Sequence, residues 1–145
     1  MSRITITRSI DAPVDLVFGT VAHISEFSKA VPHIVEVEYL SENRSGAGTR
    51  FRETRLMKGK KMSTELEVTE YEKDDHVRIV ADSHGTVWDS VFTVRPDGGH
   101  TLLTMTMDAR SNKLINTIMN FFIRGMVKKA VASDMDAVKA YCEKQ

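Results

Sequence analysis

An acid and a base stand two positions apart in a segment whose pattern predicts a β-strand: Glu53 and Arg55, within residues 49–57. Side chains two positions apart in a strand share one face, so these two can form an ion pair there. The opposite face would carry Arg50 and Arg52 without an acid between them, and burying two unpaired cations is costly. We therefore predict that Glu53 and Arg55 point toward the interior of the protein.

Three interpretations of this pair stay open. It could be a structural salt bridge near the mouth of a cavity, it could orient the polar head group of a mostly apolar ligand, or Glu53 could act as a general base with a raised pKa. His84, beside Gly85 at a predicted hairpin, is a weaker candidate for proton transfer, since a turn histidine explains it better. The other histidines are scattered and have no cysteine partner, so neither a metal site nor a cofactor is predicted.

Apolar and sulfur-containing side chains fall on faces that should line the same interior. Six of the eight methionines lie on predicted inward faces, where methionine can either fill a core or adapt to varied ligands. Core packing explains each residue singly, and a cavity of roughly a few hundred Å³ would explain their convergence equally well. The residues expected to contact a ligand are Phe51, Glu53, Arg55, Met57, Leu66, Trp88, Ser90, Phe92, Met105, Met107, Met119, Phe122 and Met126.

A regular order of elements positions these residues. Residues 3–10 alternate between polar and apolar side chains and predict a first strand. Pro13 suits the first turn of a short helix, with Asp11 or Ala12 near its N-cap, and a second short helix is predicted over residues 24–30. Six further strands, separated by turn residues, predict an antiparallel meander over residues 34–40, 49–57, 61–71, 76–83, 86–95 and 101–108.

The last third of the chain predicts one long amphipathic helix over residues 112–143, a stretch without proline. A helix of this length spans roughly 45 Å, and laid across a curved sheet it leaves a cavity. Phe121 lies beside Arg124 and Lys128 on another face, where it could touch a membrane surface or a partner. The apolar stripe recurs every three or four positions, at Ile115, Met119, Phe122, Met126, Ala130, Ser133 and Ala137.

In this order of elements, and in the sequence IDAPV at residues 10–14, the chain resembles the START-like helix-grip superfamily (SRPBCC proteins). It looks most like the bacterial polyketide cyclase/dehydrase-like branch, through residues 48–55, 67–72 and 83–86. The resemblance covers essentially the whole chain. It implies one α+β domain over residues 1–145, in which a curved seven-stranded antiparallel sheet wraps around the C-terminal helix. It also implies a deep, largely apolar cavity, but no single reaction.

Composition limits the expected partners. Lys+Arg and Asp+Glu each number 20, so the chain lacks the excess of basic residues that binding to the phosphates of a nucleic acid requires. No apolar run approaches the ~20 residues of a membrane span, and the N-terminus lacks the apolar region of a secretion signal. With one cysteine and no internal disulfide, we expect a cytoplasmic protein. The oligomeric state is left open, with a homodimer among the options.

The sequence favours a protein that binds a small hydrophobic or amphipathic molecule, as a carrier, a sequestering protein or a sensor, over an enzyme. The main alternative is a polyketide cyclase/dehydrase-type enzyme acting on an aromatic or polyketide-like substrate. In that case Glu53 would be the acid/base and Arg55 the anchor. A third hypothesis is a membrane- or partner-docking module that uses the face around Phe121.

Overall fold

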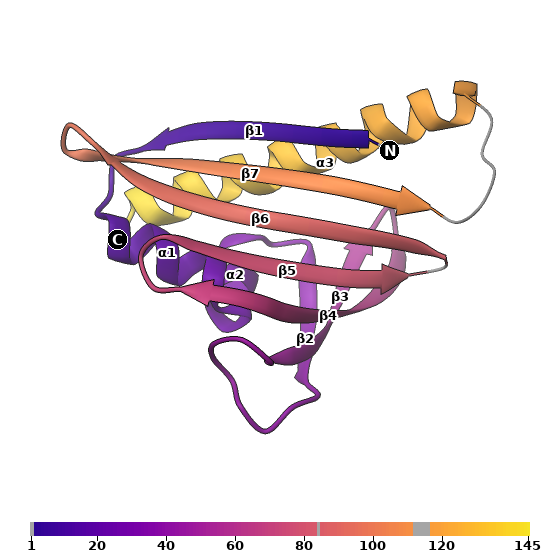
Figure 1. Cartoon of the computed structure of the whole chain (residues 1–145), viewed down its shortest axis with the longest axis horizontal. Helices are drawn as coiled ribbons and strands as arrows, with labels where there is room; N and C mark the ends of the chain where they lie inside the picture. Colours follow the sequence, from indigo (N-terminus) through magenta and orange to yellow (C-terminus); the bar gives the residue numbers. More distant parts are fainter. Residues whose placement is uncertain (1, 84, 112–116) are drawn as a thin grey trace.

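The computed structural model of the chain describes residues 2–83, 85–111 and 117–145. Its seven strands and three helices follow the predicted order (Figure 1). Their bounds are β1 (Ser2–Ile10), α1 (Val14–Ala22), α2 (Ile24–Ala30), β2 (Ile34–Tyr39), β3 (Arg50–Met57), β4 (Lys60–Glu72), β5 (His76–Ser83), β6 (Thr86–Asp97), β7 (His100–Ser111) and α3 (Thr117–Glu143).

All neighbouring strands pair antiparallel in the order β1-β7-β6-β5-β4-β3-β2. Strands β2 to β7 form a meander, and β1 returns to pair with β7, with Ser2 opposite Ala109. The turn of the β3–β4 hairpin has two residues, Lys58 and Gly59, with φ of 51° and 78°. Positive φ at both positions suits a tight hairpin turn that keeps the twist of the strands.

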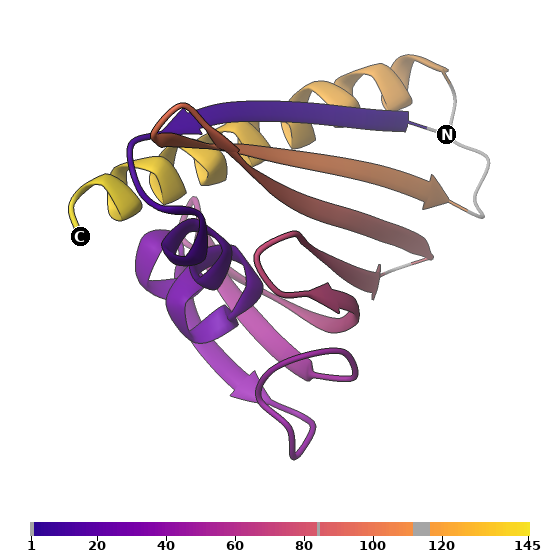
Figure 2. The same ribbon diagram turned by 60° about the vertical axis from the view of Figure 1, so that its left-hand side comes forward.

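The sheet curls around α3, and α1 and α2 lie near the end of the sheet where β6 turns into β7 (Figures 1 and 2). Helix α3 packs along β1 and against α1 and α2. Three polar contacts fix it to β1. They are an ion pair between Arg8 and Asp136 at 2.6 Å, a hydrogen bond from Lys139 Nζ to the Ser9 carbonyl at 2.6 Å, and one from Arg124 Nη2 to the Arg3 carbonyl at 3.1 Å. This is the helix-grip arrangement that the sequence predicts.

Burial along the concave face of the sheet changes from one end to the other. Near α1, Val94 and Leu103 are buried in the core. Toward the β3–β4 turn, Met107 is half-buried, and Met57 and Met62 are exposed. In the described part of the chain, the concave face is therefore closed at the α1–α2 end and exposed at the other.

The apolar face predicted for α3 was wrong, because the face that is buried in the structure is shifted from it by about one residue. Met126 is 71% exposed and Ser133 is also exposed. Over residues 130–138, valine and methionine remove more apolar area from water than alanine and serine do, so this part of the helix turns its larger side chains inward. The residues of α3 that are buried are Val131, Met135, Val138 and Cys142.

A smaller difference concerns the start of α1. Helix α1 begins at Val14 with Pro13 as its N-cap residue, rather than Asp11 or Ala12, and no side chain caps it. Ile115 lies outside the described residues.

Candidate functional site

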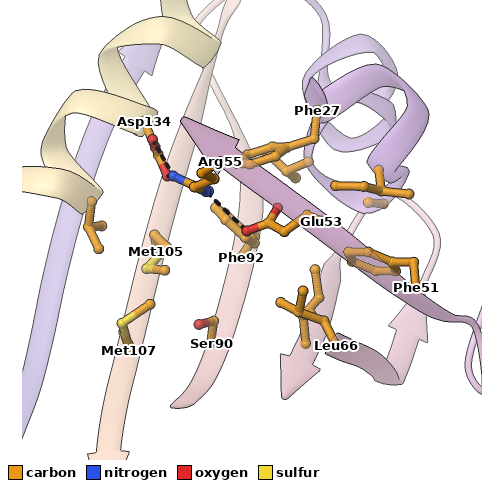
Figure 3. Close-up of a pocket in the computed structure, with 15 residues that line it drawn as sticks. Phe27, Phe51, Glu53, Arg55, Leu66, Ser90, Phe92, Met105, Met107 and Asp134 are labelled. Atoms are coloured by element: carbon orange, nitrogen blue, oxygen red, sulfur yellow. Dashed lines mark hydrogen bonds and ion pairs between the residues drawn. The ribbon is translucent and has the colours of Figure 1, made fainter. Parts of the chain in front are cut away.

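A cavity of about 130 Å³ lies between the concave face of the sheet, α3 and the α1–α2 pair, and it is partly open to solvent (Figure 3). It is smaller than the few hundred Å³ that the sequence led us to expect. Apolar cavities of about 150 Å³ can still hold a benzene molecule. The walls are mostly apolar, with a few polar side chains among them, which is the usual composition of a small-molecule site.

Three charged side chains meet inside this cavity (Figure 3). Arg55 Nε donates to Glu53 Oε1 at 3.0 Å, and Arg55 Nη1 donates to Asp134 Oδ1 at 3.2 Å and Oδ2 at 3.0 Å. The side chains of Glu53, Arg55 and Asp134 are 12%, 22% and 19% exposed. The cluster therefore joins β3 to α3 across the cavity, through a largely desolvated ion-pair network.

The inward register of β3 is as predicted, and the arginines on its other face show why. Arg50 lies on the outer face, 3.9 Å from Glu67 of β4. Arg52 is paired there with Glu38 of β2 and Glu65 of β4. On this face both arginines keep contact with water and find acids on neighbouring strands, which avoids the cost of burying two cations.

Burial changes the acid–base properties of the cluster. Desolvation raises the pKa of Glu53, and the charge and hydrogen bond of Arg55 offset this only in part. The pKa of Asp134 is raised for the same reasons in the same order, with Arg55 again opposing. Burial works to lower the pKa of Arg55, but the two carboxylates outweigh it and raise that pKa. A carboxyl group with a raised pKa exchanges a proton closer to neutral pH, so this cluster can bind a polar group or move a proton.

The cavity brings together eight of the residues predicted to contact a ligand. They come from four strands, β3, β4, β6 and β7, whose alternating side chains face α3. These residues are Phe51, Glu53, Arg55, Leu66, Ser90, Phe92, Met105 and Met107.

Three other predicted contacts do not line the cavity, and the prediction was wrong for them. Met57 is 41% exposed at the end of β3, Met126 lies on an exposed side of α3, and Trp88 is half-buried, two positions beyond Ser90. Met57 and Trp88 do face the concave side by alternation, but they lie beyond the stretch that α3, α1 and α2 enclose.

Several predicted positions lie outside the described residues. They are His84 and the side chains of Met119, Phe121 and Phe122. Of the face proposed for docking, the structure describes Arg124 and Lys128, and both are exposed.

Seven residues of the cavity wall were missed. Asp134 is the important one, since it is the second acid of the charged cluster. Asp134 lies three residues after Val131, on the face that α3 buries, and this spacing could have identified it. The apolar stripe predicted from the sequence placed the buried face on another side of the helix. The other missed residues come from the α1–α2 pair, from α3 and from β5, and they are Val21, Ala22, Ile24, Phe27, Val131 and Ile79.

Within the described residues, no group of His, Cys, Asp and Glu is arranged to hold a metal ion. No helix among them is long and apolar enough to cross a membrane.

Structures with the same fold come from distant proteins. A START superfamily protein from Mycobacterium smegmatis is 14% identical with a TM-score of 0.80, over 98% of this chain and 97% of that one. The Zhui aromatase/cyclase from Streptomyces sp. R1128 is 17% identical with a TM-score of 0.81, over 99% and 94%. A major latex-like protein from Panax ginseng is 10% identical with a TM-score of 0.75, over 97% of each chain. At such identities the likeness concerns the fold alone.

No curated protein matches the chain significantly in sequence. The family described as polyketide cyclase / dehydrase and lipid transport does match it, over residues 1–143. A match over nearly the whole sequence, on a chain with the helix-grip fold, shows that this protein belongs to the polyketide cyclase / dehydrase and lipid transport family.

Proposed function

We propose that the protein binds a small hydrophobic or amphipathic molecule in the cavity between the sheet and α3, as a carrier, a sequestering protein or a sensor. The observation that carries this proposal is the placement of one charged cluster, Glu53–Arg55–Asp134, inside mostly apolar walls. The apolar walls would supply affinity, and the cluster would orient the one polar group of the ligand.

The size of the cavity limits the affinity. A ligand of about seven heavy atoms, such as a substituted benzene, can gain at most about 10 kcal/mol, because very small ligands reach about 1.5 kcal/mol per heavy atom. This ceiling corresponds to a dissociation constant of about 50 nM, so we expect such ligands to bind no more tightly than that. A larger ligand would have to extend through the open side of the cavity.

Filling the cavity tests the proposal. In the Val131→Phe variant the added ring occupies space on the cavity wall, so binding of toluene should be lost. The matched control is Val35→Phe, which adds the same ring at a position of β2 that is 44% exposed. Ligand-observed NMR measures the binding of toluene, and native mass spectrometry of the purified protein identifies any molecule that it retains. Toluene bound equally by both variants, each folded by thermal melting, would show that the ligand is not held in this cavity.

A second candidate function is an enzyme of the cyclase/dehydrase type. The observation in its favour is the raised pKa of Glu53 inside the cavity, since a carboxylate of this kind is a stronger base than one in water. Glu53 would then remove a proton from the substrate while Arg55 anchors an oxygen of it. Glu53→Gln should abolish turnover and leave substrate binding in place. A Glu53→Gln variant that keeps its turnover would exclude this role.

A further inference from the structure

The charges inside the cavity do not balance. The guanidinium of Arg55 faces two carboxylates, those of Glu53 and Asp134, so the cluster has one acid more than it has bases. Among the described residues, the further titratable group whose charge acts on Asp134 is the ring of His33, which is exposed to solvent. A surplus charge away from water is costly, so the cluster must hold a proton or meet a cation.

One carboxylate oxygen is placed to meet that cation. Arg55 Nε contacts Glu53 Oε1, and among the described residues Glu53 Oε2 has no hydrogen-bond partner. Both oxygens of Asp134 accept from Arg55 Nη1. A donor on a ligand would therefore find its free acceptor on Glu53, which Figure 3 shows pointing between the walls of the cavity.

Aromatic side chains line the same cavity and could add to the attraction for a cation. Phe27, Phe51 and Phe92 all line the cavity, and the rings of Phe27 and Phe92 meet edge to face with centroids 6.0 Å apart. The face of an aromatic ring carries partial negative charge and attracts a cation, most strongly where water is excluded. Three rings and a surplus carboxylate thus line one cavity, a combination that favours an ammonium group over an anion.

A hydroxyl provides a second polar contact. Ser90 lines the cavity from β6 and is 9% exposed. Among the described residues its hydroxyl has no hydrogen-bond partner. Strands β5 and β4 lie between β6 and β3 in the sheet, so Ser90 and Glu53 stand on different walls (Figure 3). A ligand held at Glu53 could place a second polar atom near Ser90.

We propose that the cavity selects ligands with a cationic nitrogen on a small apolar or aromatic body, and that the nitrogen donates to the free oxygen of Glu53. This inference rests on the proposed binding function and gives it a ligand class. The same charges disfavour anionic ligands, because a carboxylate would meet two others, and the Arg55 guanidinium already donates to both of these at Nε and Nη1.

Three probes that share a phenyl ring test this preference: benzylamine, benzyl alcohol and benzoate. We expect benzylamine to bind about tenfold more tightly than benzyl alcohol, a difference of about 1.4 kcal/mol, and benzoate to bind most weakly. Isothermal titration calorimetry at neutral pH and low salt measures the three affinities.

Variants identify the source of the preference. Glu53→Gln and Asp134→Asn each remove one negative charge, so the advantage of benzylamine should disappear while benzyl alcohol binds nearly as before. Glu65→Gln is the control, because Glu65 is an exposed acid on the outer face of β4, and it should leave the whole order unchanged. Thermal melting confirms that each variant is folded, and if Asp134→Asn unfolds, Glu53→Gln carries the test alone.

Benzoate that binds as tightly as benzylamine would overturn the inference. So would an advantage of benzylamine that survives in Glu53→Gln, or that is lost in Glu65→Gln as well. In each of these cases the binding of benzyl alcohol would still support the proposed function. If none of the probes and no toluene binds, the proposed function fails, and the inference fails with it.

Discussion

At the scale of single residues, Arg55 holds the interior of the cavity together. It is the cation between two buried carboxylates, one two positions away on the same strand and one on α3. Neither Glu53 nor Asp134 has another cation within salt-bridge distance among the described residues. The stability of this region therefore depends on a single guanidinium.

Removing that guanidinium should destabilise the folded protein. In Arg55→Met, two buried carboxylates face each other without a counter-charge, and we expect a loss of about 3 kcal/mol in the free energy of unfolding at neutral pH. Arg52→Met is the control, because Arg52 pairs with acids on the outer face, and an exposed pair is worth about 0–1 kcal/mol. Urea unfolding measures both. Equal losses in the two variants would mean that the inner cluster contributes no more than a surface pair.

The pH dependence of stability should carry the signature of Glu53. Its pKa is raised by burial in the folded protein, so the folded state holds the proton more tightly than the unfolded state does. The contribution of Glu53 to stability is then fully present below the ordinary carboxyl range near about pH 4, and it is lost as the pH rises through the raised pKa.

Glu53→Gln removes this dependence, because glutamine does not titrate. Relative to the variant, the wild-type protein should lose stability as the pH rises from about 4 toward 8. Urea unfolding across that range gives the difference at each pH. A difference that is constant, or that moves in favour of the wild type, would contradict a raised pKa.

At the scale of elements, the position of α3 decides which residues line the cavity. The two-residue period correctly predicted which side chains of β3, β4, β6 and β7 face α3, because side chains of a strand alternate strictly between its two faces. For β3, the charges of Arg50 and Arg52 decided which of the two faces is the inner one. The buried face of α3 was harder to predict from the sequence. Consecutive positions such as Ser133 and Asp134 are only about 100° apart around its axis, and packing against β1, α1 and α2 decides which of them faces inward. Asp134 was missed for this reason, and the α1–α2 part of the wall was missed because short helices give no signal of what they cover.

Two methionines on α3 test the orientation of the helix. Met135 is 1% exposed and Met126 is 71% exposed. Met135→Ala should cost about 2–5 kcal/mol through lost burial and the cavity it leaves, whereas Met126→Ala should change stability by less than about 0.5 kcal/mol. Chemical denaturation of the two variants is enough for the comparison. If Met126→Ala lost more stability than Met135→Ala, the buried face of α3 would be the one predicted from the sequence.

At the scale of the whole molecule, the curved sheet and α3 form a container that is closed by α1 and α2 at one end. A ligand that binds only the folded state must stabilise that state by mass action. At a hundredfold excess over its dissociation constant the gain is about 2.7 kcal/mol. We therefore expect benzyl alcohol at such a concentration to raise the melting temperature of the wild-type protein but not that of Val131→Phe. An equal rise in both would mean that the ligand acts outside the cavity.

The pairing of β1 with β7 has a consequence for how the protein is made. Ser2 meets Ala109, so the first strand leaves the ribosome long before its partner exists. At about 5–20 residues per second, β1 waits for roughly 5–20 seconds without a neighbour. Contacts between segments so distant in the chain also form slowly, because the loop between them must first be ordered. The wall on which α3 rests is thus the last part of the sheet to be completed, and a nascent chain stalled before β7 exposes apolar strands to chaperones and to aggregation.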